Sequence, residues 1–252
     1  MSGAQISRAG SELRMEFVAI RSPSGDVYSR FLFRCQAVAS ADGFHSKPVF
    51  QAAFREYGLR LRMRTDNGAP FGSNGDSGLT ALSVWWIRLG IQPERIEPGH
   101  PEQNGRHERM HRTLKQATAS PPASNRRRQQ ERFDAFRQEY NQERPHEALN
   151  QTPPAQHYQP SSRVYPERLA PIEYPPDWLV RRVRDGGQIR WKGPSIFVAH
   201  ALKGQHVGLQ QISDSYWKVC FSFYEIGVLD EKHSKIWNLK QWQKRLDRAR
   251  IS

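Results

Sequence analysis

Hydrophobic residues recur with two periods in the first part of the chain, and these periods predict a strand followed by a helix. Residues 27–39 place apolar side chains at alternate positions from Phe31 to Ala37, which is typical of a long strand. Residues 47–58 place them along one side of a helix that begins near Pro48 and stops at Gly58. The first 24 residues show no convincing element beyond a short apolar run at 17–20.

The alternation of strand and helix continues to about residue 150. A short strand is expected at 59–66, a helix at 78–90 and a basic helix from about residue 105. A further helix is expected at 125–145, with Phe133, Phe136 and Tyr140 on one buried stripe. Strands that alternate with helices predict an α/β fold, in which helices flank a mixed sheet.

The pattern changes after residue 150. Residues 151–176 are rich in proline and predict a linker or an extended arm rather than a packed element. Residues 177–231 contain short strands at turn spacing and predict a small, all-β, barrel-like domain, which a basic tail at 232–252 follows. The remaining regions are an atypical amino-terminal segment at 1–24 and a core domain at 25–150.

The charge of the chain narrows the choice of partners. The net charge is +13 and the isoelectric point is about 10.1, which favours nucleic acid, with an acidic membrane surface as the alternative. No stretch approaches the roughly 18 consecutive apolar residues of a membrane span. Cys35 and Cys220 form no zinc or redox motif, so we expect a reducing, cytoplasmic setting.

Two carboxylates are conspicuous against this positive charge. Asp66 ends a predicted strand, and Glu108 lies near the start of the basic helix. Ligands commonly bind at the carboxyl edge of α/β sheets, and two neighbouring carboxylates repel each other unless a cation lies between them. Oxygen ligands suit Mg²⁺ or Mn²⁺, and a pair of such ions promotes attack on a phosphodiester. A solvated salt bridge within the helix is the other open interpretation of Glu108.

The spacing of residues along the basic helix supports the first interpretation. Arg112 and Lys115 share a helical face with Glu108, where they can hold a DNA backbone. The opposite face offers Met110, Leu114 and Ala117 to the core.

Three further features keep two interpretations each. His107 and His111 have the i, i+4 spacing of zinc ligands, but no third ligand follows, so polar contacts near DNA are favoured. Residues 125–132, "NRRRQQER", are either a phosphate-binding patch or a solvated helix start. One of Trp85 and Trp86 is expected in the core, and the other either in the core or at a dimer surface.

Three successive motifs resemble the signatures of a known family. "RTDNGAPF", "PGHPEQNGRHERMHRTLK" and "YNQERPHEALNQTPPAQHY" are similar to the integrase core of bacterial insertion-sequence transposases and retroviral integrases, over residues 27–158. The resemblance implies an RNase H-like fold and a triad of two aspartates and one glutamate. In the family this triad binds two Mg²⁺ or Mn²⁺ ions, which activate water or a DNA 3′-hydroxyl. Asp66 matches the second aspartate and Glu108 the glutamate.

The resemblance also implies partners. These are double-stranded DNA, as element ends and as target, a second copy of the chain, and a nucleoid-associated place in a bacterial cytoplasm. Arg112 and Lys115 match basic positions that approach the DNA, and Arg106 and Arg109 lie beside them. The β domain resembles the carboxyl-terminal DNA-binding barrel of the family, and its candidate phosphate contacts are Arg181, Arg182, Arg184, Arg190 and Lys192.

The first aspartate of the triad has no match. Its position falls near Ile6 or Ser7, and neither is a carboxylate. Asp26 resembles a second-strand aspartate that the family does not use for metal, so it is the less favoured candidate; Glu12 and Glu16 are in no convincing strand. We therefore expect a metal-dependent DNA cleavage and strand-transfer protein that is impaired. The alternatives are an inactive DNA-binding relic that interferes with an intact transposase, and a simple RNase H-like nuclease.

Overall fold

Two compact units make up the structure, which is a computed structural model. Unit 1 comprises Met1–Phe71 and Pro93–Pro166, and unit 2 comprises Gly72–Gln92 and Glu167–Ser252. No helix in the described part is both long enough and apolar enough to cross a membrane. The structure describes residues 5–6, 13–19, 29–38, 42–65, 68, 70–73, 75, 77–95, 105–119 and 121–251, without the side chains of 5–6, 13–19, 105–108, 111, 250 and 251.

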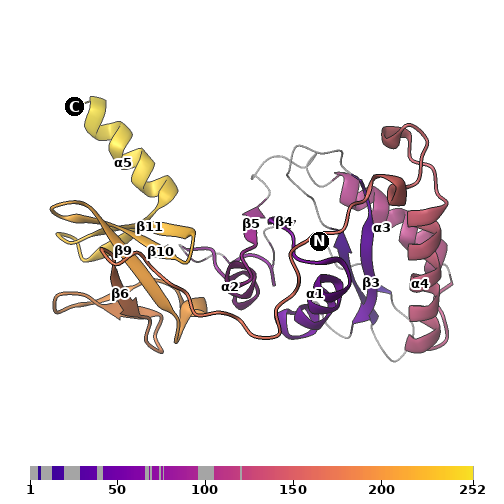
Figure 1. Ribbon diagram of the computed structural model, residues 1–252, viewed down its shortest axis with the longest axis horizontal. Coiled ribbons are helices and arrows are strands. Elements are labelled where there is room, and N and C mark those ends of the chain that lie inside the picture. The colour runs from indigo at the N-terminus through magenta and orange to yellow at the C-terminus, as the bar shows by residue number, and fades with distance from the viewer. Residues whose placement is uncertain are drawn as a thin grey trace. The chain divides into compact units, whose positions relative to one another are not determined.

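Unit 1 is built on an antiparallel sheet with the order β1-β2-β3, and it also contains the strand pair β4-β5, apart from Gln92 at the start of β5. Figure 1 shows β3 with α1 on one side and α4 on the other. Strand β4 and helices α2 (Ala81–Arg88) and α4 lie within a few residues of their expected positions, but β3 begins at Leu32 rather than near residue 27, and α1 begins at Gly43 with Pro48 inside the helix rather than at its start. The elements are β1 (Gln5–Ile6), β2 (Leu13–Ala19), β3 (Leu32–Val38), α1 (Gly43–Tyr57), β4 (Arg62–Thr65), β5 (Gln92–Arg95), α3 (Gly105–Thr118) and α4 (Arg126–Gln142).

The prediction that residues 1–24 lack a regular element beyond 17–20 was wrong. Strand β2 runs from Leu13 to Ala19 and pairs with both β1 and β3. Its apolar residues Leu13, Met15, Phe17 and Ala19 do alternate, with Arg14 and Glu16 between them. Val18 is apolar at a position where the alternation requires a polar residue, so the strand pattern is hard to recognise in the sequence.

The core between β3, α3 and α4 contains the predicted stripe. Phe133, Phe136 and Tyr140 are buried together with Met110 and Leu114. The prediction for Ala117 was wrong, because Ala117 is exposed and the next two residues, Thr118 and Ala119, are buried instead.

Side chains of α4 cover the outer edge of β3. The Asn141 amide accepts a hydrogen bond from the Leu32 backbone N–H (2.8 Å) and donates one to the Leu32 carbonyl (2.9 Å). Gln130 makes the same pair of bonds to the Ala37 N–H and the Cys35 carbonyl, and Arg137 donates to the Phe33 carbonyl. An uncovered edge strand is a template for unwanted pairing, so α4 both packs on the sheet and closes its edge.

The first part of the proline-rich segment packs against unit 1, although we expected an unpacked arm. The Leu59 N–H donates to the Arg163 carbonyl (2.6 Å), and the Ser161 N–H donates to the Tyr57 carbonyl (3.2 Å). The Tyr158 ring stacks on Phe31 at 4.1 Å between centroids. These contacts join positions about a hundred residues apart, which no local pattern reveals. A short 3₁₀ turn at Glu147–Leu149 precedes the segment, and a second at Pro154–His157 lies within it.

Unit 2 contains an open antiparallel sheet with the order β12-β11-β10-β9-β6, a separate β7-β8 hairpin, and two helices. The predicted barrel is not confirmed, because in the described residues β12 and β6 remain edges of the sheet. The elements are α2 (Ala81–Arg88), β6 (Leu179–Arg182), β7 (Gln188–Arg190), β8 (Ser195–Phe197), the 3₁₀ turn His200–Leu202, β9 (His206–Ser213), β10 (Tyr216–Phe221), β11 (Tyr224–Asp230), β12 (Lys235–Asn238) and α5 (Leu239–Ile251).

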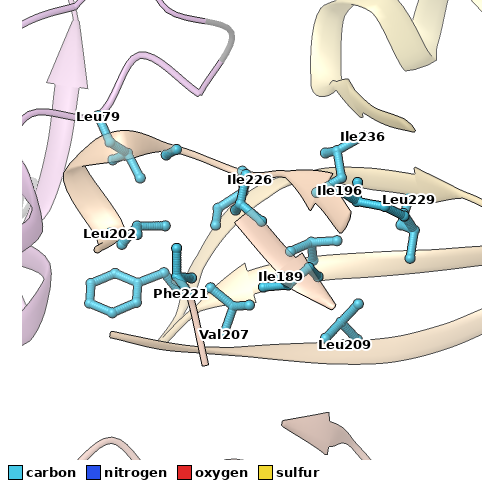
Figure 2. Close-up of a cluster of buried hydrophobic side chains, with 14 of the residues drawn as sticks. Leu79, Ile189, Ile196, Leu202, Val207, Leu209, Phe221, Ile226, Leu229 and Ile236 are labelled. Carbon is cyan, nitrogen blue, oxygen red and sulfur yellow. The ribbon is translucent and has the colours of Figure 1, made fainter. Parts of the chain in front are cut away.

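One apolar cluster forms the core of unit 2. Figure 2 shows side chains of the hairpin, such as Ile189 and Ile196, together with Val207 and Leu209 of β9 and with Leu79, which precedes α2. Trp85 and Trp86 of α2 are 7% and 0% exposed, so both tryptophans are core residues.

Candidate carboxylate site and nucleic-acid interface

Strand β4 leads directly to the predicted metal ligand Asp66. Met63 and Thr65 of β4 are buried, at 2% and 5% exposure, while Arg62 and Arg64 alternate with them. Strand β4 ends at Thr65, one position before Asp66. Asp66 itself and the less favoured candidate Asp26 lie outside the described residues.

The predicted glutamate lies in the first turn of α3, which begins at Gly105. A helix N-terminus carries a partial positive charge, so this place in the helix favours a carboxylate. The side chains of Glu108, Arg106, His107 and His111 lie outside the described part, so the face that Glu108 was predicted to share is described only from Arg109 onward.

Three predicted DNA-contacting cations of α3 project into solvent. Arg109, Arg112 and Lys115 are exposed, whereas Met110 and Leu114 on the opposite face are buried. Among the described residues, none of the three cations forms an ion pair. Their charge is therefore available to a polyanion.

Two carboxylates fit one Mg²⁺ better than a pair of ions. Mg²⁺ in proteins is usually bound through one or two carboxylates, and waters or substrate phosphates complete its octahedron. The two predicted ligands, Asp66 and Glu108, would supply that donor set, while the two-ion site that the resemblance implies needs a third carboxylate. No three His, Cys, Asp or Glu side chains gather in the described part of the chain. Strand β1, near the expected position of the first aspartate, consists of Gln5 and Ile6.

In unit 2 the predicted phosphate contacts differ from one another. Arg190 is exposed, and it forms no ion pair among the described residues. Lys192 instead places its Nζ 2.8 Å from Oε1 of Glu231. The same oxygen accepts hydrogen bonds from the indoles of Trp217 (2.6 Å) and Trp191 (3.2 Å). The hydrogen bond from Lys192 lowers the pKa of Glu231, against the opposing effect of burial. The charge of Lys192 is thus neutralised within the unit.

The neighbouring residue Asp230 forms an ion pair with Arg245. The sequence analysis did not identify Asp230 as a functional or structural residue. Asp230 is fully buried, and its Oδ2 lies 2.7 Å from Nδ1 of His233, 3.3 Å from Nε1 of Trp237 and 3.5 Å from Nη2 of Arg245. Burial acts to raise the pKa of Asp230, but the hydrogen bonds from His233 and Trp237 outweigh it and lower the pKa. The only sequence signal was an Asp-Glu pair that directly follows an apolar run, "GVLDE".

Residues 125–132 form the start of α4, and their arginines make contacts within unit 1. Arg132 donates to the Pro121 carbonyl (2.6 Å), Arg126 donates to the Ala37 carbonyl (3.2 Å), and Arg128 donates to the Ser124 hydroxyl (3.2 Å). Arg127 pairs with Glu131 at 3.4 Å. These arginines satisfy backbone and side-chain groups of unit 1.

Two residues of the third motif pack within unit 1. Asn141 holds the edge of β3, and His146 packs its ring against Tyr140 at 4.7 Å between centroids. Burial, together with nearby Arg30 and Arg144, lowers the pKa of His146, so the imidazole is neutral at pH 7.

Comparison with known proteins gives one family match and several solved structures. Residues 89–154 match the family described as "Integrase core domain". An intasome of simian T-cell lymphotropic virus in complex with the PP2A regulatory subunit B56 gamma aligns at 16% identity over 89% of this chain and 75% of that chain, with a TM-score of 0.49. The HTLV-2 integrase catalytic core in complex with magnesium aligns at 13% identity over 63% of this chain and 93% of that chain, with a TM-score of 0.45.

The catalytic core of BIV integrase aligns at 15% identity over 61% of this chain and 89% of that chain, with a TM-score of 0.42. The assignment rests on the family match, which contains α3, α4 and the third motif as far as Pro154. The segment at residues 89–154 therefore matches the integrase core domain family, as the second and third motifs predicted, while the first motif at residues 64–71 lies outside the match.

Proposed function

We propose that this chain is a DNA-binding protein of the transposition and integration class, related to bacterial insertion-sequence transposases. The observation that carries the proposal is the integrase-core match at residues 89–154, because that segment contains α3, on which Arg109, Arg112 and Lys115 form no ion pair among the described residues. An RNase H-like arrangement of unit 1 and pairing with a second copy of the chain, or with an intact transposase, belong to the same proposal.

DNA phosphates are the proposed ligands of the exposed cations. Arg109, Arg112 and Lys115 lie on one helix with i, i+3 and i+6 spacing, and in unit 2 Arg190 adds a cation that has no ion pair in the described part of the chain. Contacts of this kind bind the backbone of double-stranded DNA and carry no base specificity. Lys192, which we expected among these contacts, is not included because Glu231 holds it.

The proposed catalytic carboxylates are Asp66 and Glu108. A bound Mg²⁺ would act there as a Lewis acid on a phosphodiester oxygen. The two carboxylates would hold the ion, and the cations of α3 would orient the DNA backbone beside it. With one ion in place of two, cleavage and strand transfer are expected to be strongly reduced.

The DNA-binding proposal is tested by titrating a fluorescent duplex with the protein at several salt concentrations. We expect an affinity whose logarithm falls linearly with the logarithm of the salt concentration, because each phosphate contact releases a condensed counterion. Binding that is equally tight at 50 and 300 mM salt, or no binding at 50 mM, would contradict the proposal. Vesicles of anionic lipid, titrated in parallel, test the membrane alternative.

The composition of β1 favours a second candidate function, that of a DNA-binding relic without catalysis. This strand offers Gln5 and Ile6 where the family places an aspartate nearby. Calorimetric titration with Mn²⁺ separates the candidates: one weakly bound ion, lost in Glu108→Gln, supports the incomplete site. Two tightly bound ions, together with strand transfer on a DNA substrate, would instead show an intact enzyme.

A further inference from the structure

A single carboxylate bridges the two strands nearest the predicted metal ligands. Glu94 of β5 accepts a hydrogen bond from Nη1 of Arg62 (3.0 Å) through Oε1. Its Oε2 accepts hydrogen bonds from both Nε (3.2 Å) and Nη2 (3.1 Å) of Arg64. Both carboxylate oxygens are therefore engaged by strand β4.

The contacts between Glu94 and the two arginines lie on the face of β4 that is turned away from the core. Met63 and Thr65 point into the core, and Arg62 and Arg64 occupy the alternate positions. The Glu94 side chain is 21% exposed, against 54% for Arg62 and 32% for Arg64. A partly covered carboxylate with three donors is a better-defined contact than a solvated surface pair.

The two bridged strands lead to the two predicted carboxylates. Strand β4 ends one position before Asp66, and β5 ends at Arg95, after which the chain runs on to α3 and Glu108. The pairing of β4 with β5 therefore fixes the points from which both segments start. Each strand has only four residues, so few backbone hydrogen bonds hold that pairing.

We propose that Glu94 is a positioning residue, which holds β4 in register with β5 and so sets where the Asp66 and Glu108 segments begin. The inference rests on the proposed function, because it takes these two carboxylates as the metal ligands. Without the negative charge of Glu94, two arginines on one face of a short strand are left without their shared anion. Two like charges that lie close together repel each other, and this repulsion no longer has a carboxylate of β5 to offset it.

The test compares Glu94→Gln with Glu131→Gln, which removes the carboxylate of another arginine pair in the same unit. The Arg127–Glu131 pair lies on α4, 87% and 62% exposed, and takes no part in the strand pairing. Amide hydrogen exchange of residues 62–65 is measured first, because it needs neither metal nor activity. Mn²⁺ affinity by calorimetry and the global melting temperature are measured on the same samples.

For Glu94→Gln we expect exchange of β4 amides about three- to tenfold faster and Mn²⁺ binding weaker by a similar factor, with the melting temperature little changed. Glu131→Gln should change none of these, and Glu94→Asp, which keeps the charge, should restore part of the protection. Unchanged β4 exchange in Glu94→Gln, or a change equal to that of Glu131→Gln, would overturn the proposal. If the wild-type protein binds no Mn²⁺, the metal site of the proposed function fails, while the exchange measurement still decides the role of Glu94.

Discussion

Cations of two kinds occur in this molecule, and α3 and the end of β11 are the places to compare them. On α3, Arg109, Arg112 and Lys115 are exposed, and among the described residues they meet no anion. At the end of β11, Glu231 holds Lys192 and the buried Asp230 holds Arg245. A count of basic residues treats these groups alike. In the proposed function the first group binds a polyanion, whereas the second group makes ion pairs inside unit 2.

The largest loss of stability is expected from a substitution at Asp230. Replacing Asp230 with Asn should destabilise unit 2 by about 2–3 kcal/mol, because His233, Trp237 and Arg245 then face a neutral amide in place of a charged, buried carboxylate. Urea unfolding followed by tryptophan fluorescence measures the change. A loss below about 0.5 kcal/mol, the range of an ordinary surface substitution, would show that Asp230 does not hold this region together.

Acid should weaken the held cations and leave the free ones unaffected. The pKa values of Asp230 and Glu231 are lowered in the folded state, so the unfolded chain takes up protons first as the pH falls. The stability that both groups contribute is complete above about pH 5 and is lost as the pH falls below about 4, the ordinary range of carboxyl groups. Melting temperatures of wild type and Asp230→Asn should therefore converge between pH 5 and pH 3. A constant difference over that range would contradict the assignment.

Replacing Lys192 should have a small effect on stability and almost none on DNA. Lys192→Gln removes a contact of a side chain that is 61% exposed, so we expect a cost of about 0.2–1 kcal/mol. Its DNA affinity should stay within about twofold of wild type, because Glu231 already neutralises the charge. A tenfold loss of DNA affinity in this variant would move Lys192 into the group of free cations.

The smallest effect on stability is expected on α3. Replacing Arg109, Arg112 and Lys115 together with Gln should change the free energy of unfolding by less than about 0.5 kcal/mol, since no described contact is lost. Thermal or urea unfolding of the triple variant checks this. A larger loss would mean that these cations also support the fold.

Periodic patterns predicted much of unit 1 because its elements are long and one-sided. The stripe of Phe133, Phe136 and Tyr140 is buried as expected. Strand β4 ends at Thr65, within one residue of the strand end that the sequence predicted. The family match likewise confirms what the motifs indicated for residues 89–154. Strand β5 was missed, because Gln92–Arg95 has no apolar alternation and is held by pairing and by Glu94.

Contacts between distant positions explain what the sequence did not predict. Glu231 holds Trp191 and Lys192 from 40 residues away, and Asn141 bonds to Leu32 across 109 positions. The open sheet of unit 2 differs from the expected barrel for the same reason, because strand spacing predicts the number of strands but not whether the last meets the first. Roles for Asp66 and Glu108 come from resemblance and from position and stay predictions.

Two variants with equal loss of charge test the central claim most directly. One replaces the free cations Arg109, Arg112 and Lys115 with Gln; the other replaces three cations that have anionic partners, Arg127, Lys192 and Lys203. The slope of log affinity against log salt for a DNA duplex is measured for both and for wild type. We expect the first variant to lower the slope by about 2–3, since each phosphate contact contributes about 0.9, and the second by less than about 1. Equal changes in the two slopes would contradict the division into free and held cations. They would mean that only the net charge of the chain determines how its DNA affinity depends on salt.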